Sequence, residues 1–234
     1  MLNMYAAHKA EVWFAVIILA MALCLLHYLL FGPRRTTEIP QKESGLVRRF
    51  NTRERFFHWA TMLVFLVVMV SGIGQVLGGT SSHHLGPLHG NLGVVLLIIF
   101  VINIITWFKD SLFRNYDWIW LKSMGGYVSR NNVHLPAGRF NAGQKIYYWL
   151  ILGSFIALLV SAILMEQNGH GPHTLATRQS MMWSIHGLVG CFATTMVIGH
   201  AYLSILANPQ TAKVLWNGFV SRSYAEEHHS RWEF

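Results

Sequence analysis

The chain has 234 residues, of which 53% are hydrophobic and only 12% are charged. This balance is typical of a membrane protein and excludes an ordinary soluble domain. The formal net charge of +8 could suggest a nucleic-acid partner, but nearly all lysines and arginines flank apolar stretches, so we expect membrane lipid and no nucleic acid around this protein.

Five apolar segments are long enough to cross a bilayer, which takes about 20 residues per helix. In chain order, the segments are Val12–Phe31, Phe57–Leu77, Asn91–Phe108, Ile146–Met165 and Met181–Ala207. Gly32-Pro33 follows the first segment and Asn208-Pro209 follows the last, and glycine and proline commonly end helices. The sequence therefore predicts an all-α fold, an integral membrane helix bundle with five transmembrane helices, built as a single domain over residues 1–234.

The first apolar segment could be a cleavable signal peptide, but its apolar run is too long and no small-residue cleavage site follows it. We expect a retained extra helix with a cytoplasmic linker over residues 1–47, and a four-helix core over residues 48–234. The longest connection, from Lys109 to Lys145, is rich in tyrosine and tryptophan and is expected to lie along the membrane surface.

The distribution of lysine and arginine predicts the orientation of the chain. Five spans alternate the connecting segments between two faces, so that one face receives sixteen of these residues and the other receives two. Basic loops stay on the cytoplasmic side of the membrane. We therefore expect the amino terminus outside and the carboxy terminus in the cytoplasm.

Four histidines lie within or at the mouths of apolar segments, where an ionisable group is expensive and indicates a functional site. The topology places His58 and His200 near the cytoplasmic side, and His89 and His186 near the outer side. The 14 residues between His186 and His200 correspond to about 21 Å of helix rise and leave both side chains on roughly one face. Pairs of histidines in a helix bundle suit haem iron, so we predict two haems b with axial ligands His89 and His186 (outer) and His58 and His200 (inner).

Other candidate ligands have weaker patterns. His27 also lies in an apolar segment, but no partner at its depth remains, so we expect a structural role. Cys24 and Cys191 lie in apolar segments and are expected to pack there rather than to form a disulfide or a metal site. The histidines of the two outer loops are either solvated or bind a metal ion. These are His83, His84, His170 and His173.

Two glycines each follow a paired histidine by four residues, on the same helix face. They are Gly93 and Gly190. The missing side chain would let a flat porphyrin lie against the helix, or it would ease helix packing in the membrane. The sequence leaves both interpretations open.

Several motifs resemble the cytochrome b (gamma) subunit of respiratory formate dehydrogenases. The segment Arg139-Phe-Asn-Ala-Gly-Gln-Lys145, followed by Ile-Tyr-Tyr-Trp149, is similar to the residues before that family's third core helix. The stretches around the four histidines resemble its haem-ligand segments: Phe56–Trp59, Leu88–Gly90, Ser184–Gly187 and Gly199–Tyr202. The tail is similar as well, over Gly218–Arg222 and Glu227–Trp232. The resemblance covers residues 48–234, and the first helix departs from it because the well-known members have four spans.

The resemblance implies a dihaem cytochrome b membrane subunit of a formate dehydrogenase complex in the bacterial inner (cytoplasmic) membrane, with a periplasmic amino terminus. Its partners would be an iron–sulfur (beta) subunit and a molybdenum- or tungsten-containing catalytic (alpha) subunit. Electrons would reach a quinone, either menaquinone or ubiquinone, at the cytoplasmic side. The chain would then be the electron-transfer subunit of a formate:quinone oxidoreductase and would not oxidise formate itself.

The resemblance also implies quinone contacts at Asn141, Gly143 and Gln144, beside His200. An amide can hold a quinone carbonyl at the wet edge of a bundle. Alternatively, Asn141 caps the fourth span, because asparagine is a favoured residue at helix starts. Both roles are compatible with the sequence.

Two other functions remain possible at this stage. A cytochrome b subunit of a membrane-bound nickel–iron hydrogenase, or of another molybdoenzyme (thiosulfate-type) reductase, would share the histidine pairs. The Asn-Ala-Gly-Gln motif and the His-His-x-Arg-Trp tail favour formate dehydrogenase. A non-haem anchor or transporter would use the histidines for proton relay and would be expected to carry Asp or Glu within its spans, where the sequence has none.

Overall fold

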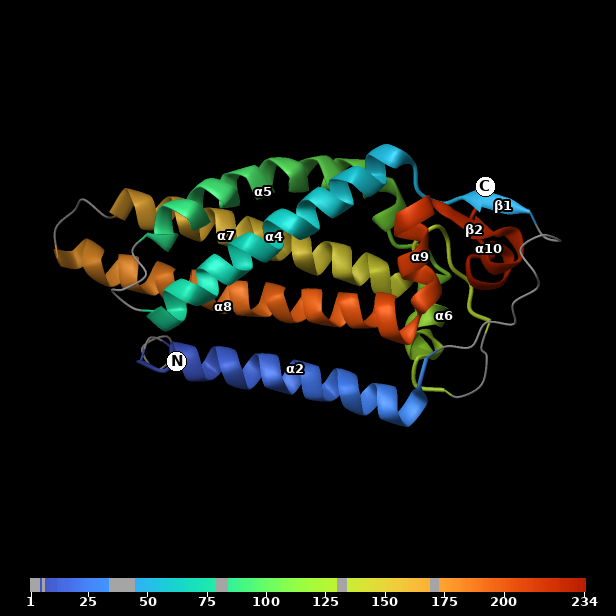
Figure 1. Ribbon diagram of the computed structural model, residues 1–234, viewed down its shortest axis with the longest axis horizontal. Coiled ribbons are helices and arrows are strands. Elements are labelled where there is room, and N and C mark those ends of the chain that lie inside the picture. The colour runs from blue at the N-terminus through green and yellow to red at the C-terminus, as the bar shows by residue number, and fades with distance from the viewer. Residues whose placement is uncertain (1–4, 6, 34–44, 79–83, 130–133, 169–172) are drawn as a thin grey trace. The chain divides into compact units, whose positions relative to one another are not determined.

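The computed structural model describes residues 5, 7–33, 45–78, 84–129, 134–168 and 173–234, except for the side chains of 167–168 and 173–179. Within these residues, five helices are long and apolar enough to cross a membrane, which confirms the predicted all-α class and the number of spans. Figure 1 labels them, and they are α2 (Lys9–Phe31), α4 (Thr52–Gly78), α5 (Leu85–Trp107), α7 (Ala142–Asn168) and α8 (His173–Tyr202).

Short elements fill the connections between the long helices. The segment between α5 and α7 contains η2 (Lys109–Ser111), α6 (Asp117–Lys122) and η3 (Met124–Gly126). After α8 come a π-helical turn η4 (Leu203–Ala207), α9 (Pro209–Asn217) and α10 (Arg222–His228). The strands β1 (Leu46–Arg48) and β2 (Phe219–Ser221) form an antiparallel pair, which the sequence analysis did not predict.

Two of the long helices begin with the same reciprocal cap. At α4, the Glu54 backbone N–H donates to Asn51 Oδ1 (2.9 Å), and the Asn51 N–H donates to Glu54 Oε2 (2.8 Å). At α7, Asn141 and Gln144 exchange the equivalent bonds at 2.9 and 3.1 Å. Each pair satisfies two backbone donors that a helix start leaves open, so the spacing Asn-x-x-Glu/Gln defines both starts.

The chain divides into two compact units, each assembled from parts of the same long helices. The first comprises Met1–Ala22, Met62–Ile98 and Leu150–Ile198, and the second comprises Leu23–Thr61, Ile99–Trp149 and Gly199–Phe234. His89 and His186 belong to the first unit, and His58 and His200 belong to the second. Each predicted histidine pair therefore lies complete within one unit.

In the first unit, α2 packs against α8 through an aromatic cluster. Tyr5, Trp13 and Cys191 are buried together, and the Trp13 indole N–H donates to the Tyr5 hydroxyl at 3.0 Å. A Cβ on Gly190 would contact the Trp13 ring at 3.6 Å. Cys191 is packed in this buried cluster, as predicted.

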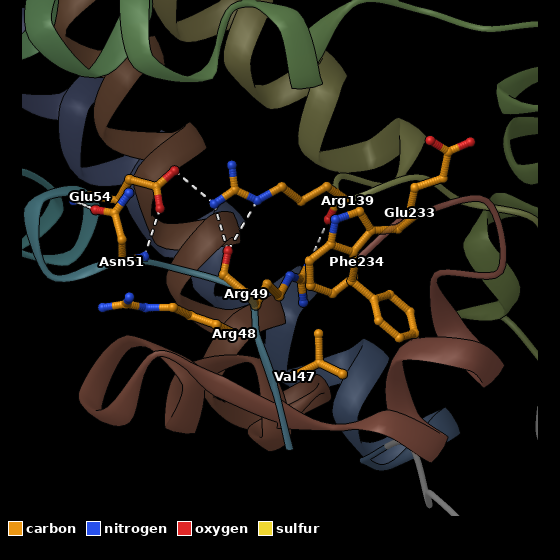
Figure 2. Close-up of a pocket in the computed structure, with 9 residues that line it drawn as sticks. Val47, Arg48, Arg49, Asn51, Glu54, Arg139, Glu233 and Phe234 are labelled. Carbon is orange, nitrogen blue, oxygen red and sulfur yellow. Dashed lines mark hydrogen bonds and ion pairs between the residues drawn. The ribbon is translucent and has the colours of Figure 1, made fainter. Parts of the chain in front are cut away.

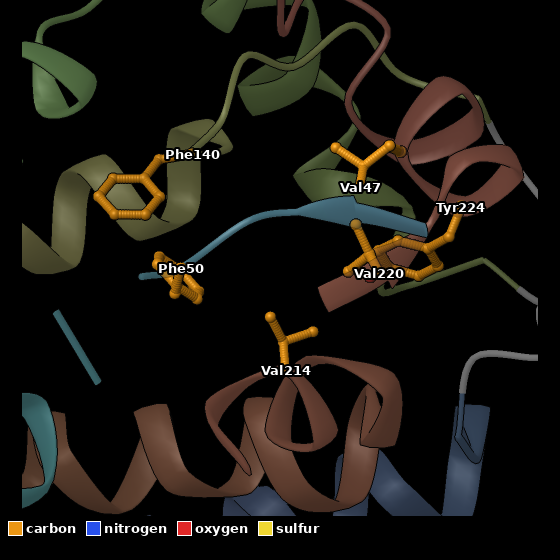
Figure 3. Packing of buried hydrophobic residues seen from close by; sticks show 7 residues of the cluster. Val47, Phe50, Phe140, Val214, Val220 and Tyr224 are labelled. Atoms are coloured by element: carbon orange, nitrogen blue, oxygen red, sulfur yellow. The ribbon is translucent and has the colours of Figure 1, made fainter. Parts of the chain in front are cut away.

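In the second unit, residues distant in sequence form a compact apolar core, shown in Figure 3. Its members are Val47, Phe50, Phe140, Val214, Val220, Tyr224 and Ala225. Val47 and Val220 are directly paired across the two strands. This core joins the linker before α4, the loop before α7 and the tail, so it holds the start of α7 in place.

Candidate functional site

The first unit brings His89 of α5 and His186 of α8 together, as the depth argument predicted. Their ring centres are 6.1 Å apart, with an interplanar angle of 72°. Gly72 of α4 makes room for the His89 ring, because a Cβ at this position would lie 3.0 Å from His89 Cε1. The missing side chain lets the imidazole approach the α4 backbone.

Each ring of this pair has a hydrogen-bond partner at its Nδ1 atom. His89 Nδ1 lies 2.9 Å from the Val68 carbonyl oxygen and 3.2 Å from Ser71 Oγ. Because a carbonyl oxygen only accepts, Nδ1 carries the proton and Nε2 keeps a lone pair that is available to bind a metal. His186 Nδ1 lies 2.9 Å from Ser161 Oγ, and the Ser161 hydroxyl donates to its own helix. His186 is thus arranged in the same way as His89.

The second unit brings His58 of α4 and His200 of α8 together, which is the other predicted pair. Their ring centres are 6.3 Å apart, with an interplanar angle of 46°. The Tyr147 ring is stacked on His200 at 4.4 Å and 13°, and the Trp107 ring lies 6.0 Å from His58. His58 Nδ1 is buried, with no hydrogen-bond partner among the described residues.

The spacing of both pairs fits one metal ion between two imidazoles. A metal–nitrogen bond is about 2 Å, and an imidazole nitrogen lies about 1.1 Å from its ring centre, so two rings on opposite sides of one metal have centres about 6 Å apart. The observed 6.1 and 6.3 Å agree with this distance and are too long for a direct hydrogen bond between the rings. Two axial histidines in an apolar helix bundle suit haem iron.

His27 has both ring nitrogens engaged by protein. Nε2 lies 2.9 Å from the Tyr127 carbonyl oxygen, and Nδ1 lies 2.5 Å from the Tyr202 hydroxyl. The carbonyl requires a proton on Nε2, so a neutral ring accepts the hydroxyl proton at Nδ1. No lone pair remains for a metal, which agrees with the predicted structural role.

The structure separates the two interpretations of the glycines that follow the paired histidines. Gly190 faces Trp13 of α2, which supports the helix-packing interpretation for this glycine. A Cβ on Gly93 would meet nothing within 4 Å. Of the loop histidines, His84 is exposed, whereas His83 and His170 lie outside the described residues, as does the His173 side chain.

The residues implied as quinone contacts lie at the start of α7. Asn141 and Gln144 form the reciprocal cap described above, so the capping alternative is present in the structure. The cap uses Asn141 Oδ1 as acceptor and does not involve the Nδ2 amide group. Gly143 packs against an aromatic ring, since a Cβ there would lie 2.6 Å from the Trp120 ring.

Lys145, which follows this motif, forms a buried ion pair. Its Nζ lies 2.8 Å from Asp117 Oδ2, and the two side chains are 2% and 1% exposed. The same oxygen accepts the Arg114 backbone N–H at 2.6 Å. The pair ties the first turn of α7 to α6.

A network of arginines and carboxylates lies before α4 and α7. Arg139 forms ion pairs with Glu54 and Asp110, both at 2.7 Å, and also donates to the Arg49 carbonyl oxygen. The Trp107 indole N–H donates to Glu54 at 3.3 Å. Arg49 is 2% exposed, and burial lowers the pKa of its guanidinium. The network therefore joins the two capped helix starts and reaches a ring beside His58.

Figure 2 shows a pocket of about 430 Å³ that this network lines. Its lining residues are Val47, Arg48, Arg49, Asn51, Glu54, Arg139, Trp232, Glu233 and Phe234. The three implied quinone contacts are not among them. The pocket is therefore distinct from the start of α7 that carries those residues.

The residues that contact the Nδ1 atoms of His89 and His186 were not predicted from the sequence. Ser71, Ser161 and Gly72 were not singled out, although a signal exists. Val-Ser-Gly-Ile at 70–73 and Val-Ser-Ala-Ile at 160–163 repeat one pattern in two spans, and both serines reach a paired histidine.

Comparison with known proteins identifies one family and several individual relatives. Residues 49–222 match a family described as prokaryotic cytochrome b561. The chain is 25% identical to the formate dehydrogenase cytochrome b556(fdo) subunit of Escherichia coli strain K12, over 82% of this chain and 93% of that protein. It is 24% identical to the nitrate-inducible formate dehydrogenase cytochrome b556(Fdn) subunit of the same strain, over 81% and 91%. It is also 21% identical to the formate dehydrogenase cytochrome b556 subunit of Haemophilus influenzae, over 79% and 81%.

Proposed function

The chain belongs to the prokaryotic cytochrome b561 family of membrane proteins, and from this premise we propose that it is the dihaem cytochrome b subunit of a formate dehydrogenase complex. The observation that carries the proposal is the presence of two histidine pairs, each with ring centres about 6 Å apart. The similarity to three formate dehydrogenase subunits over most of their length supports the choice of complex.

Each residue of the pairs has a defined role in this proposal. His89 and His186 would hold the outer haem b through their Nε2 atoms, and His58 and His200 would hold the inner haem b. When bound, the two haems would supply one-electron transfer from an iron–sulfur (beta) subunit, itself reduced by a molybdenum- or tungsten-containing catalytic (alpha) subunit, to a quinone. The surrounding apolar side chains exclude water, and the chain carries out no chemistry on formate.

We place the quinone at the start of α7, on the cytoplasmic side. Asn141 can donate an amide proton from Nδ2 to a quinone carbonyl while Oδ1 continues to cap the helix. Gly143 and Gln144 shape the same turn, and Tyr147, one turn further along, stacks on His200. The excess of lysine and arginine on one face supports a bacterial inner-membrane location with this end of α7 in the cytoplasm.

The first test is the haem content of the purified complex. A reduced-minus-oxidised optical spectrum with haem quantified per chain should show two b-type, six-coordinate, low-spin haems. Replacing His89 or His186 with alanine should remove one haem, and replacing His58 or His200 should remove the other. His27→Ala is the matched control and should keep both haems. A single haem per wild-type chain, or loss of a haem in the control, would contradict the assignment.

The second test separates quinone binding from capping. Asn141→Asp keeps an oxygen that caps α7 but removes the amide donor, so quinol formation should fall while formate-driven haem reduction survives. Asn141→Ser is the control for the cap. Serine can also cap the helix and also lacks the amide, so quinol formation should fall in this variant as well. Normal quinol formation in both variants would place the quinone elsewhere.

Reduction of the haems by hydrogen instead of formate would favour the hydrogenase alternative.

A further inference from the structure

The two histidine pairs differ in what lies behind their Nδ1 atoms. In the outer pair, His89 Nδ1 has the Val68 carbonyl oxygen and Ser71 Oγ within hydrogen-bond distance. His186 Nδ1 has Ser161 Oγ, and the ring is also hydrogen-bonded to the Leu158 backbone. In the inner pair, the Nδ1 atom of His58 is buried without a hydrogen-bond partner among the described residues, and the His200 ring is stacked on Tyr147. This difference distinguishes the pair in the first unit from the pair in the second unit.

The two serines behind the outer pair are fixed in place. The Ser71 hydroxyl donates to the Val68 carbonyl at 2.9 Å, and the Ser161 hydroxyl donates to the Ala157 carbonyl at 2.7 Å. Because each hydroxyl proton is engaged by its own helix, a lone pair of each Oγ is left to accept the histidine N–H. The serines are 4% and 2% exposed, so water does not compete for these positions.

A hydrogen bond of this kind changes the iron that the other ring nitrogen binds. An acceptor behind Nδ1–H raises the basicity of the imidazole, and a more basic ligand stabilises oxidised iron over reduced iron. Hydrogen bonding to axial ligands is one of the means by which a protein sets a haem potential. The outer pair has such acceptors on both rings, whereas the His200 ring of the inner pair is stacked on Tyr147.

We propose that Ser71 and Ser161 are positioning residues that give the outer haem a lower reduction potential than the inner haem. This inference rests on the proposed function. Electron transfer from the outer to the inner site is then favourable in the direction that leads to the start of α7. Such a transfer would oxidise the outer iron and reduce the inner iron by one electron, and it would need no proton and no further reactant.

The test is potentiometry of the purified complex, followed by the optical spectrum of each haem. The component missing from His89→Ala identifies the outer haem, which should be the one of lower potential. In a Ser71→Ala/Ser161→Ala double variant, its equilibrium should shift about tenfold toward the reduced form, which is about 59 mV for one electron. The inner haem should keep its potential.

Two controls make the result specific to the hydroxyl groups. Ser154 lies on α7 with Ser161, is buried, and donates only to its own helix, so Ser154→Ala should shift neither haem. Ser161→Thr retains the hydroxyl and should keep the wild-type potential. Unchanged potentials in the double variant, an equal shift of both haems, or an outer haem of higher potential would overturn the inference.

The same preparation distinguishes this failure from failure of the proposed function. Two haems per chain with the wrong order of potentials would overturn only the role of the serines. One haem or none per chain would overturn the proposed function itself. Loss of the outer haem in the double variant, with retention in Ser161→Thr, would show that the hydroxyls hold the haem in place and would overturn their role in setting its potential.

Discussion

Replacement of Lys145 by methionine tests the ion pair that ties α7 to α6. The Lys145 ammonium and the Asp117 carboxylate are almost fully buried and lie 2.8 Å apart. Methionine is similar in length but uncharged, so the carboxylate would keep only the Arg114 backbone N–H among its described partners. Breaking a buried pair by removing one partner costs about 3–5 kcal/mol, because an uncompensated charge remains.

This loss of stability should appear as more frequent local opening of the start of α7. At 1.36 kcal/mol per factor of ten, about 3 kcal/mol raises the opening equilibrium by about 100-fold or more. Hydrogen exchange read by mass spectrometry would measure it in peptides covering residues 112–127 and 139–149 of the intact complex. Exchange in the outer parts of α5 and α8 should change little.

Two further variants define what would refute this reasoning. Lys122 is exposed on α6, so Lys122→Met should leave exchange unchanged. Adding Asp117→Asn to Lys145→Met removes the stranded charge while an amide oxygen still accepts the Arg114 N–H, and most of the protection should return. Wild-type exchange in Lys145→Met, or no recovery in the double variant, would show that the pair does not hold this turn.

Two more predictions concern single side chains. Burial, and then the charge of Arg49, hold the pKa of His229 well below its usual range, so the unfolded chain takes up a proton below about pH 6.5 that the folded protein does not. Stability should therefore be lost as the pH falls below 6.5. The variant His229→Gln should flatten the dependence of the thermal midpoint on pH. An unchanged slope of the thermal midpoint against pH would contradict this prediction. Gly72→Ala would place a methyl group 3.0 Å from the His89 ring and should reduce the content of the outer haem. Gly153→Ala, where a Cβ meets nothing within 4 Å, should not, and equal haem content in both variants would rule out a close approach at Gly72.

The number of spans and the grouping of the histidines could be predicted from the sequence because both depend on local properties. The length of an apolar run decides whether a helix can cross the membrane, and the loop charges decide its direction. Those two facts assign each histidine a depth, and the structure brings together the same pairs, His89 with His186 and His58 with His200. The cap at Asn141 is local as well, because its partner Gln144 is three residues away.

Contacts between distant segments could be found only in the tertiary structure. Ser161 lies 25 residues from His186, and Lys145 lies 28 residues from Asp117, and no helical or strand period relates such positions. The pairing of β1 with β2 joins residues near 47 and 220, and three-residue strands are too short to show an alternating pattern.

Gly190 shows most directly what the sequence does not determine, because a glycine in a sequence indicates only that a side chain is absent. The sequence allowed either a porphyrin or a neighbouring helix to fill that space, and the position of Trp13 in the fold decided for the helix. Hydrophobic length thus determined the number of spans, and together with loop charge it predicted the grouping of the histidines. Packing between helices decided which groups lie behind each ring, because hydrogen bonds and close contacts depend on distances of a few ångströms that no local pattern encodes.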